Sequence, residues 1–175
     1  MLQIRFPMRL HRFLLCVSLT AGLLPHLSAA GMTMSTLQNL PAVGVKVRGL
    51  SPDGMTLGLS EAELVQTVSA ALQKVGVRVA RGPEVDQLAG GPTLEVTANI
   101  TPFGVRSHLF ILRLELRENV KFVRKTQNLV TVPAITWDAE TDGSTTKIEV
   151  IRAKLAELAE RFAAEWSEAG AATGK

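Results

Sequence analysis

The chain has 175 residues, of which 46% are hydrophobic and 20% are charged, proportions that are typical of a globular protein and argue against intrinsic disorder. The 19 Lys and Arg residues exceed the 16 Asp and Glu residues by three, and this excess lies entirely in the first thirty residues, which contain Arg5, Arg9 and Arg12 and no acidic residue. The remainder is neutral, so it lacks the cationic surplus that binding to nucleic acid requires.

Residues 1–30 have the three zones of a cleaved signal peptide. The arginines precede a nearly unbroken apolar run over residues 13–24, and Ser28-Ala29-Ala30 provides the small residues of a cleavage site. As a helix, the run would span about 18 Å, too little for about 30 Å of bilayer hydrocarbon. Cys16 lies near the start of the run rather than after it, which disfavours a lipoprotein. We therefore expect cleavage near Gly31, export to the periplasm or secretion, and no transmembrane span in the mature protein.

Loss of the signal peptide removes Cys16 and two of the three histidines. No cysteine remains, and His108 is the only histidine. No G-x-S-x-G sequence, which marks a nucleophilic serine in many hydrolases, occurs in the chain. We therefore expect a non-enzymatic protein without a cofactor.

The mature chain is expected to form one domain with short flexible ends. Residues 31–41 show no clear period and are interpreted as a tether, residues 42–170 as the domain, and residues 171–175 as a disordered tail. The domain begins with a strand, because valines alternate with glycine and charged residues over residues 43–48.

The first helix has recognisable signals at both ends. Ser60 and Glu63 fit a capping box, apolar residues follow at helical spacing over residues 64–75, and Gly76 supplies a left-handed residue at the end. A short strand is expected directly afterwards, over residues 77–79. A strand, a crossover helix and a second strand predict a parallel pair with a right-handed connection.

Three further strands and a second helix complete the predicted domain. Alternation predicts strands over residues 94–100, 109–123 and 129–137, and Pro133 marks the last as an edge strand or the site of a bulge. An apolar stripe at helical spacing runs from Ile148 to Trp166. The order β-α-β-β-β-β-α predicts an α+β fold, a mixed sheet of four to five strands with two helices on one face.

An acidic segment precedes the second helix. Asp138, Glu140 and Asp142 have the spacing of an EF-hand calcium loop, with Glu149 at its twelfth position. However, the preceding segment is predicted to be a strand rather than a helix, and Glu149 also fits a capping box. We therefore interpret the segment as a solvated loop whose negative charge favours the helix N-terminus, and we expect no metal site.

The predicted hairpin of residues 109–137 carries apolar residues on both faces. Leu109 and Ile111 lie opposite the face that is expected to pack on the helices, and Val123 follows Phe122 at the far end of the strand. Such a stretch is either buried on both faces or exposed for a partner. Because only two helices are predicted, Leu109, Ile111 and Val123 are the candidate partner-binding residues.

These elements resemble those of a widespread group of small exported bacterial proteins. The resemblance lies in the strand of residues 109–123, the return strand ending Ala134-Ile135-Thr136-Trp137, and the final helix with Phe162 and Trp166. The topology is also similar to periplasmic accessory modules, such as the lipopolysaccharide-assembly lipoprotein and the N-terminal domain of the Tol-system propeller protein. This chain differs from the lipoprotein in having no cysteine at its mature start.

The export signal, the neutral mature chain, the lack of a catalytic constellation and the doubly apolar hairpin favour a non-catalytic periplasmic module that binds an envelope component through its sheet and long hairpin, as the resemblance also implies. The second hypothesis is a carrier of a lipid or another small ligand on an uncovered sheet face, and the third is an enzyme of unknown type.

Overall fold

The computed structural model describes residues 37, 38, 40–123 and 129–172. The expected signal peptide and the tip of the expected hairpin, residues 124–128, lie outside the described residues.

Five strands form one mixed sheet in the order β2-β1-β3-β4-β5. β1 runs parallel to β2 and β3, whereas β3, β4 and β5 are successively antiparallel. The strands are β1 (Val43–Leu50), β2 (Val79–Ala80), β3 (Thr93–Phe103), β4 (Ser107–Val123) and β5 (Leu129–Thr145).

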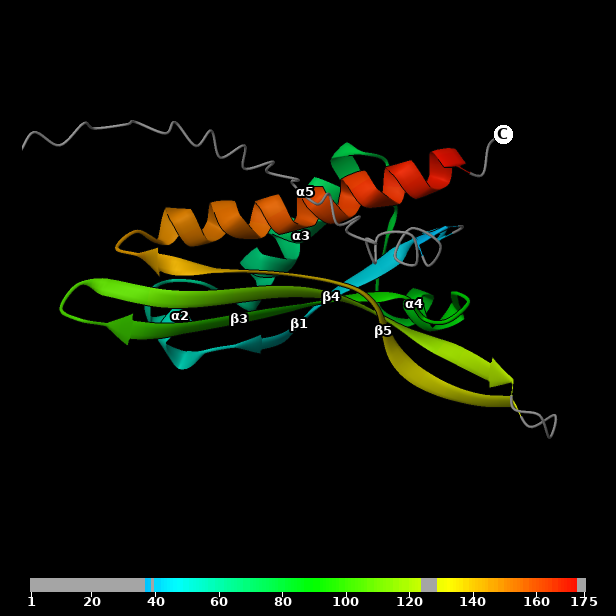
Figure 1. Ribbon diagram of the computed structural model, residues 1–175, viewed down its shortest axis with the longest axis horizontal. Coiled ribbons are helices and arrows are strands. Elements are labelled where there is room, and N and C mark those ends of the chain that lie inside the picture. The colour runs from blue at the N-terminus through cyan, green and yellow to red at the C-terminus, as the bar shows by residue number, and fades with distance from the viewer. Residues whose placement is uncertain (1–36, 39, 124–128, 173–175) are drawn as a thin grey trace, which may run out of the picture.

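Two long helices, α3 (Glu61–Lys74) and α5 (Ile148–Ala172), cover one face of this sheet (Figure 1). Two short helices, α2 (Pro52–Thr56) and α4 (Pro83–Gln87), lie in the connections that follow β1 and β2. The architecture confirms the predicted α+β class, including the parallel pair of β1 and β2 and the position of β5 at the edge of the sheet.

The start of α3 confirms half of the predicted capping box. The Ser60 hydroxyl accepts a hydrogen bond from the backbone N–H of Glu63 at 3.2 Å, and Gly76 has the expected positive φ of 83°. The carboxylate of Glu63 does not return to the Ser60 backbone but binds Arg152 on α5. This hydrogen bond is the main cause that raises the pKa of Arg152, and it ties the two covering helices together.

The core lies between the helices and the sheet. The even-numbered residues of β4 from Phe110 to Leu116 are buried against it, as their alternation predicts. The α5 residue Phe162 is fully buried and packs edge-to-face on Trp137 of β5, with ring centroids 4.9 Å apart. The indole N–H of Trp137 donates to Glu165 at 2.6 Å, so the partly polar ring is satisfied inside the core.

The predicted loop over residues 138–145 is wrong, because these residues continue β5 to Thr145. They pair with the first half of β4, where Asp142 lies opposite Ile111 and Glu140 lies opposite Arg113. Residues 138–145 therefore form a strand because they pair with β4, although their sequence is typical of a loop. Within the described residues, no group of three or more His, Cys, Asp or Glu residues is placed to hold a metal ion.

Both expected ends of the domain also differ from the prediction. Leu37 and Leu40, from the expected tether, are buried in the core, and the Leu40 carbonyl accepts a hydrogen bond from the Trp166 indole at 3.4 Å. At the other end, α5 continues through Ala172, two residues into the expected disordered tail. Burial of apolar side chains in the core is favourable even where the sequence shows no helical or strand periodicity, and this explains why Leu37 and Leu40 belong to the core.

Candidate functional site

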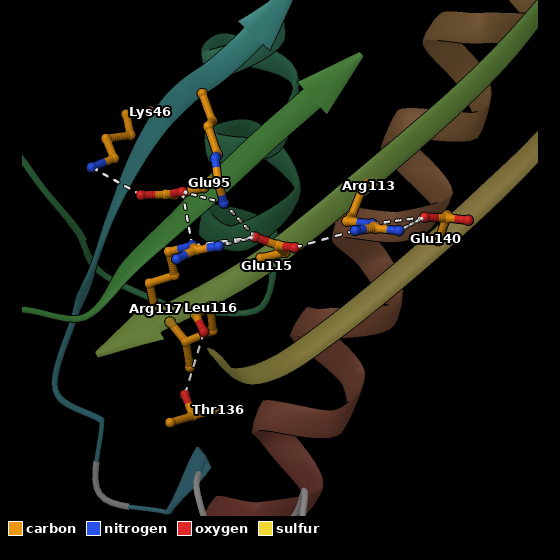
Figure 2. A network of polar contacts seen from close by, with 9 residues as sticks. Lys46, Glu95, Arg113, Glu115, Leu116, Arg117, Thr136 and Glu140 are labelled. Atoms are coloured by element: carbon orange, nitrogen blue, oxygen red, sulfur yellow. Dashed lines mark hydrogen bonds and ion pairs between the residues drawn. The ribbon is translucent and has the colours of Figure 1, made fainter. Parts of the chain in front are cut away.

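The face of the sheet opposite α3 and α5, here called the open face, combines a charged network with exposed apolar residues. It is built from residues of β1, β3, β4 and β5 that alternate with the core positions. Figure 2 shows the charged side chains from close by. The network consists of Lys46, Arg48, Glu95, Arg113, Glu115, Arg117 and Glu140.

Two carboxylates at the centre of the network are buried. Glu95 and Glu115, which face each other across β3 and β4, are only 8% and 5% exposed. Arg117 bridges them, with its Nε 3.0 Å from Glu95 and its Nη2 2.9 Å from Glu115. Lys46 adds a contact to Glu95 at 3.0 Å, and Arg48 adds one to Glu115 at 3.2 Å. Because a buried carboxylate is costly unless it is paired, these cations are what allow the two glutamates to lie there.

A second ion pair extends the network to the edge strand. Arg113 of β4 lies directly opposite Glu140 of β5 and donates to it from Nε at 2.7 Å. The hydrogen bond to Glu140, followed by the charge of the same residue, raises the pKa of Arg113. Arg113 also lies 3.6 Å from Glu115, so Glu115 is placed between Arg117 on one side and Arg113 on the other (Figure 2).

A hollow of about 410 Å³ opens beside these charges. Arg48, Arg113, Glu115 and Glu140 line it together with the uncharged side chains of Thr97, Asn99 and Ile111. The hollow therefore lies between the charged network and Ile111, an apolar residue on the same face of β4.

Exposed apolar side chains gather at the end of the open face where β3 turns into β4. Phe103 is 56% exposed, Val105 in the turn is 99% exposed, and Leu109 and Ile111 on β4 are 43% and 46% exposed. We call these four residues the turn patch. Sequence reasoning selected Leu109 and Ile111 but missed the other two residues of the patch, because one strand was predicted to end at residue 100 and the next to begin at residue 109. The long alternation of β3 was the available signal, since it places Phe103 on the same face as Thr101 and Asn99.

Val123 does not belong to the turn patch. It is the last residue of β4, whereas Leu109 is the third, so about fourteen residue steps, on the order of 45 Å, separate the two positions. Nothing is described of the Val123 side chain itself. The three candidate residues therefore do not form one surface, because Leu109 and Val123 lie near opposite ends of a 17-residue strand.

The far end of the hairpin extends beyond the sheet. The pairing of β3 with β4 ends at Arg117, and from Glu118 onward β4 pairs with β5 alone. This two-stranded part, the hairpin arm, projects from the body of the molecule (Figure 1). A bulge in β5 at Thr136 lies at the base of the arm, three residues after Pro133.

His108, the histidine retained after the expected cleavage, lies at the start of β4 opposite Thr145 and is half-buried. It is therefore separated from the buried carboxylates by several residues of β4.

No protein-family model matches the chain, and no curated protein matches it by sequence. Solved structures with a similar arrangement include a minor lipoprotein from Acinetobacter baumannii, with 12% identity and a TM-score of 0.37 over 73% of this chain and 93% of that one. Another is a dodecameric PelC variant from Paraburkholderia phytofirmans, with 10% identity and a TM-score of 0.41 over 71% of this chain and 87% of that one. None of the described helices has a stretch long and apolar enough to cross a bilayer.

Proposed function

We propose that this protein is a non-catalytic periplasmic module that binds another protein of the cell envelope through the open face of its sheet. The observation that carries this proposal is the turn patch, which exposes four apolar side chains at one end of the open face and reaches the charged network at Ile111. Exposed apolar patches that border polar residues are a feature of interaction sites.

The composition of the open face favours a protein partner. Aromatic residues and arginine are enriched where proteins meet, and a polar rim around an apolar centre is the usual arrangement. Phe103 supplies the aromatic anchor here, and Arg113 and Arg48 supply charged groups at the border of the patch. The network also fixes these arginines before any partner arrives, which reduces the entropy that binding must overcome.

The alternative function, a lipid carrier on the same face, is supported less well. An acyl chain lying along the sheet would have to cross the charged centre, where Glu95, Glu115 and Arg117 lie. Covering charges with hydrocarbon carries a desolvation penalty that the turn patch alone would have to offset.

Co-purification from envelope extracts with matched variants tests the proposal. The test variant is Leu109→Thr with Ile111→Thr, which keeps β-propensity while removing apolar surface from the patch. The control variant is Val75→Thr with Val150→Thr, since these residues are 45% and 37% exposed but lie at the C-cap of α3 and on α5.

We expect the wild type and the control to retain a stoichiometric protein partner, and the test variant to retain at least tenfold less. Urea unfolding of all three proteins checks that they are folded. Equal retention by the test variant, or recovery of lipid without a protein, would contradict the proposal.

A further inference from the structure

A second cleft lies at the β2 edge of the sheet, away from the turn patch. β2 has only two residues, and it pairs with β1 only at Val43 and Gly44. β1 continues for six more residues, from Val45 to Leu50, and in the described part of the chain no strand lies beside this outer edge. A cleft of about 690 Å³ opens there between α3, β1 and the chain that follows β2. This volume is in the range of established ligand sites.

The backbone of β1 is oriented to accept another strand. The N–H of Val43 donates outward, to the Arg78 carbonyl at 3.0 Å, whereas the N–H of Gly44 donates inward, to the Pro92 carbonyl at 2.9 Å. Because this direction alternates along a strand, the N–H groups of Val45 and Val47 point to the outer edge. Val45 lines the cleft, and Val47 lies one residue beyond Lys46, the last β1 residue that lines it, directly before the register shift between Val47 and Gly49. Such an edge binds an extended peptide by adding it to the sheet.

Helix α3 forms one wall of the cleft with a stripe that is separate from its core stripe. The core stripe contains Leu64, Val68 and Leu72, which are buried. The residues of the cleft stripe are mostly small or polar, which leaves room beside β1: Ala62, Val65, Gln66, Ser69, Ala70 and Gln73. From first to last they cover about 16 Å of helix, the length of about five residues of extended chain.

The charges that line the cleft favour an acidic side chain on the occupant. Lys46 and Arg81 line it, against one carboxylate, Asp86. Arg81 contacts Glu84 through its backbone alone: its N–H donates to the Glu84 carboxylate at 3.3 Å, and its carbonyl accepts from the Glu84 N–H at 3.2 Å. The Arg81 guanidinium has no ion-pair partner among the described residues. Lys46 pairs with Glu95, but its side chain remains 60% exposed.

We propose that this cleft binds an extended segment of a partner protein, which adds a strand along β1 beside α3 and places an acidic side chain against Arg81. Lys46 belongs both to this cleft and to the charged network of the open face. The inference is argued from the β1 edge, α3 and Arg81, so it does not depend on the function proposed above.

Peptide selection against the full exported chain tests the inference. A phage-displayed library of random twelve-residue peptides provides the probes, and the selected sequences are synthesised for affinity measurements. Ala70→Trp fills the cleft from an exposed helix position, and Gln66→Trp does the same one turn earlier. Ala164→Trp is the matched control, because it places the same ring on an exposed position of α5.

We expect selected peptides to carry at least one Asp or Glu and to bind the control like the wild type. Each cleft variant should weaken binding at least tenfold, and Arg81→Ala should weaken it about threefold to tenfold. Bound peptide should also slow hydrogen exchange at the Val47 amide, which distinguishes strand addition from docking by side chains alone.

Three outcomes would overturn the inference: peptides that bind both cleft variants at full strength, a Val47 amide that stays unprotected, or a selection that returns no binding peptide. Concentration-dependent self-association that Ala70→Trp abolishes would also overturn it, because a second copy of the chain would then occupy the cleft. Melting curves for the two tryptophan variants show whether lost binding reflects unfolding, and agreement between the two variants is required.

Discussion

Replacing Arg117 by methionine tests whether the buried carboxylates depend on this one side chain. Methionine keeps much of the apolar stem but removes both charged contacts, at 3.0 Å to Glu95 and 2.9 Å to Glu115. Arg117 donates two hydrogen bonds to Glu115, from Nε at 3.2 Å and Nη2 at 2.9 Å, whereas its contact with Glu95 is an ion pair. A hydrogen bond to a charged group contributes about 1.5–3 kcal/mol, so these two contribute at most about 6 kcal/mol. Lys46 and Arg48 remain within reach of the same carboxylates, and we therefore expect a loss of about 3 kcal/mol in the free energy of unfolding.

Urea unfolding followed by tryptophan fluorescence measures this loss, because Trp137 is buried in the core. The control is Glu140→Gln, which breaks the outer ion pair with Arg113. Both side chains of that pair are at least 40% exposed, so the control should cost less than about 1 kcal/mol. If Arg117→Met costs no more than Glu140→Gln, then water or the remaining cations satisfy both carboxylates, and the reasoning that makes Arg117 their essential partner is refuted.

Two further predictions concern β5. Gly143→Ala should destabilise the protein by about 1–3 kcal/mol in the same urea assay, because the added Cβ would lie 2.9 Å from the buried Phe110 ring; an unchanged midpoint would show that the ring can move. Millimolar calcium should leave the melting temperature unchanged, because Asp138, Glu140 and Asp142 are strand residues. A bound ion at 100 times its Kd would add about 2.7 kcal/mol, so an upward shift that Asp142→Ala abolishes would contradict the assignment of this segment.

Local patterns predicted much of the architecture. The Ser60 cap and Gly76 marked both ends of α3, and alternation along β4 identified the core positions from Phe110 to Leu116. These signals are readable because they depend on neighbours within one turn of helix or on the alternation of a single strand. For the same reason, alternation placed Leu109 and Ile111 on the face opposite the core, where the structure exposes them.

The candidate sites were harder to predict, because they depend on which segments lie side by side. The pairing of Glu95 with Glu115 across two strands, and the bridge that Arg117 forms between them, follow from the register of β3 with β4. Neither composition nor local alternation determines how β3 and β4 are aligned with each other. The cleft beside α3 arises in a similar way, because β2 stops after two residues and leaves the edge of β1 without a neighbour.

By itself, the sequence determined the α+β class, both ends of α3 and the core face of the long strand, and it marked the strand that contains Pro133 as an edge strand or the site of a bulge. Tertiary structure alone decided that residues 138–145 form a strand and that Leu37 and Leu40 enter the core. The physical reason is the range of the interactions. Caps and alternation act between near neighbours in the chain, whereas strand pairing and burial join residues that are distant in sequence and depend on what else has folded around them.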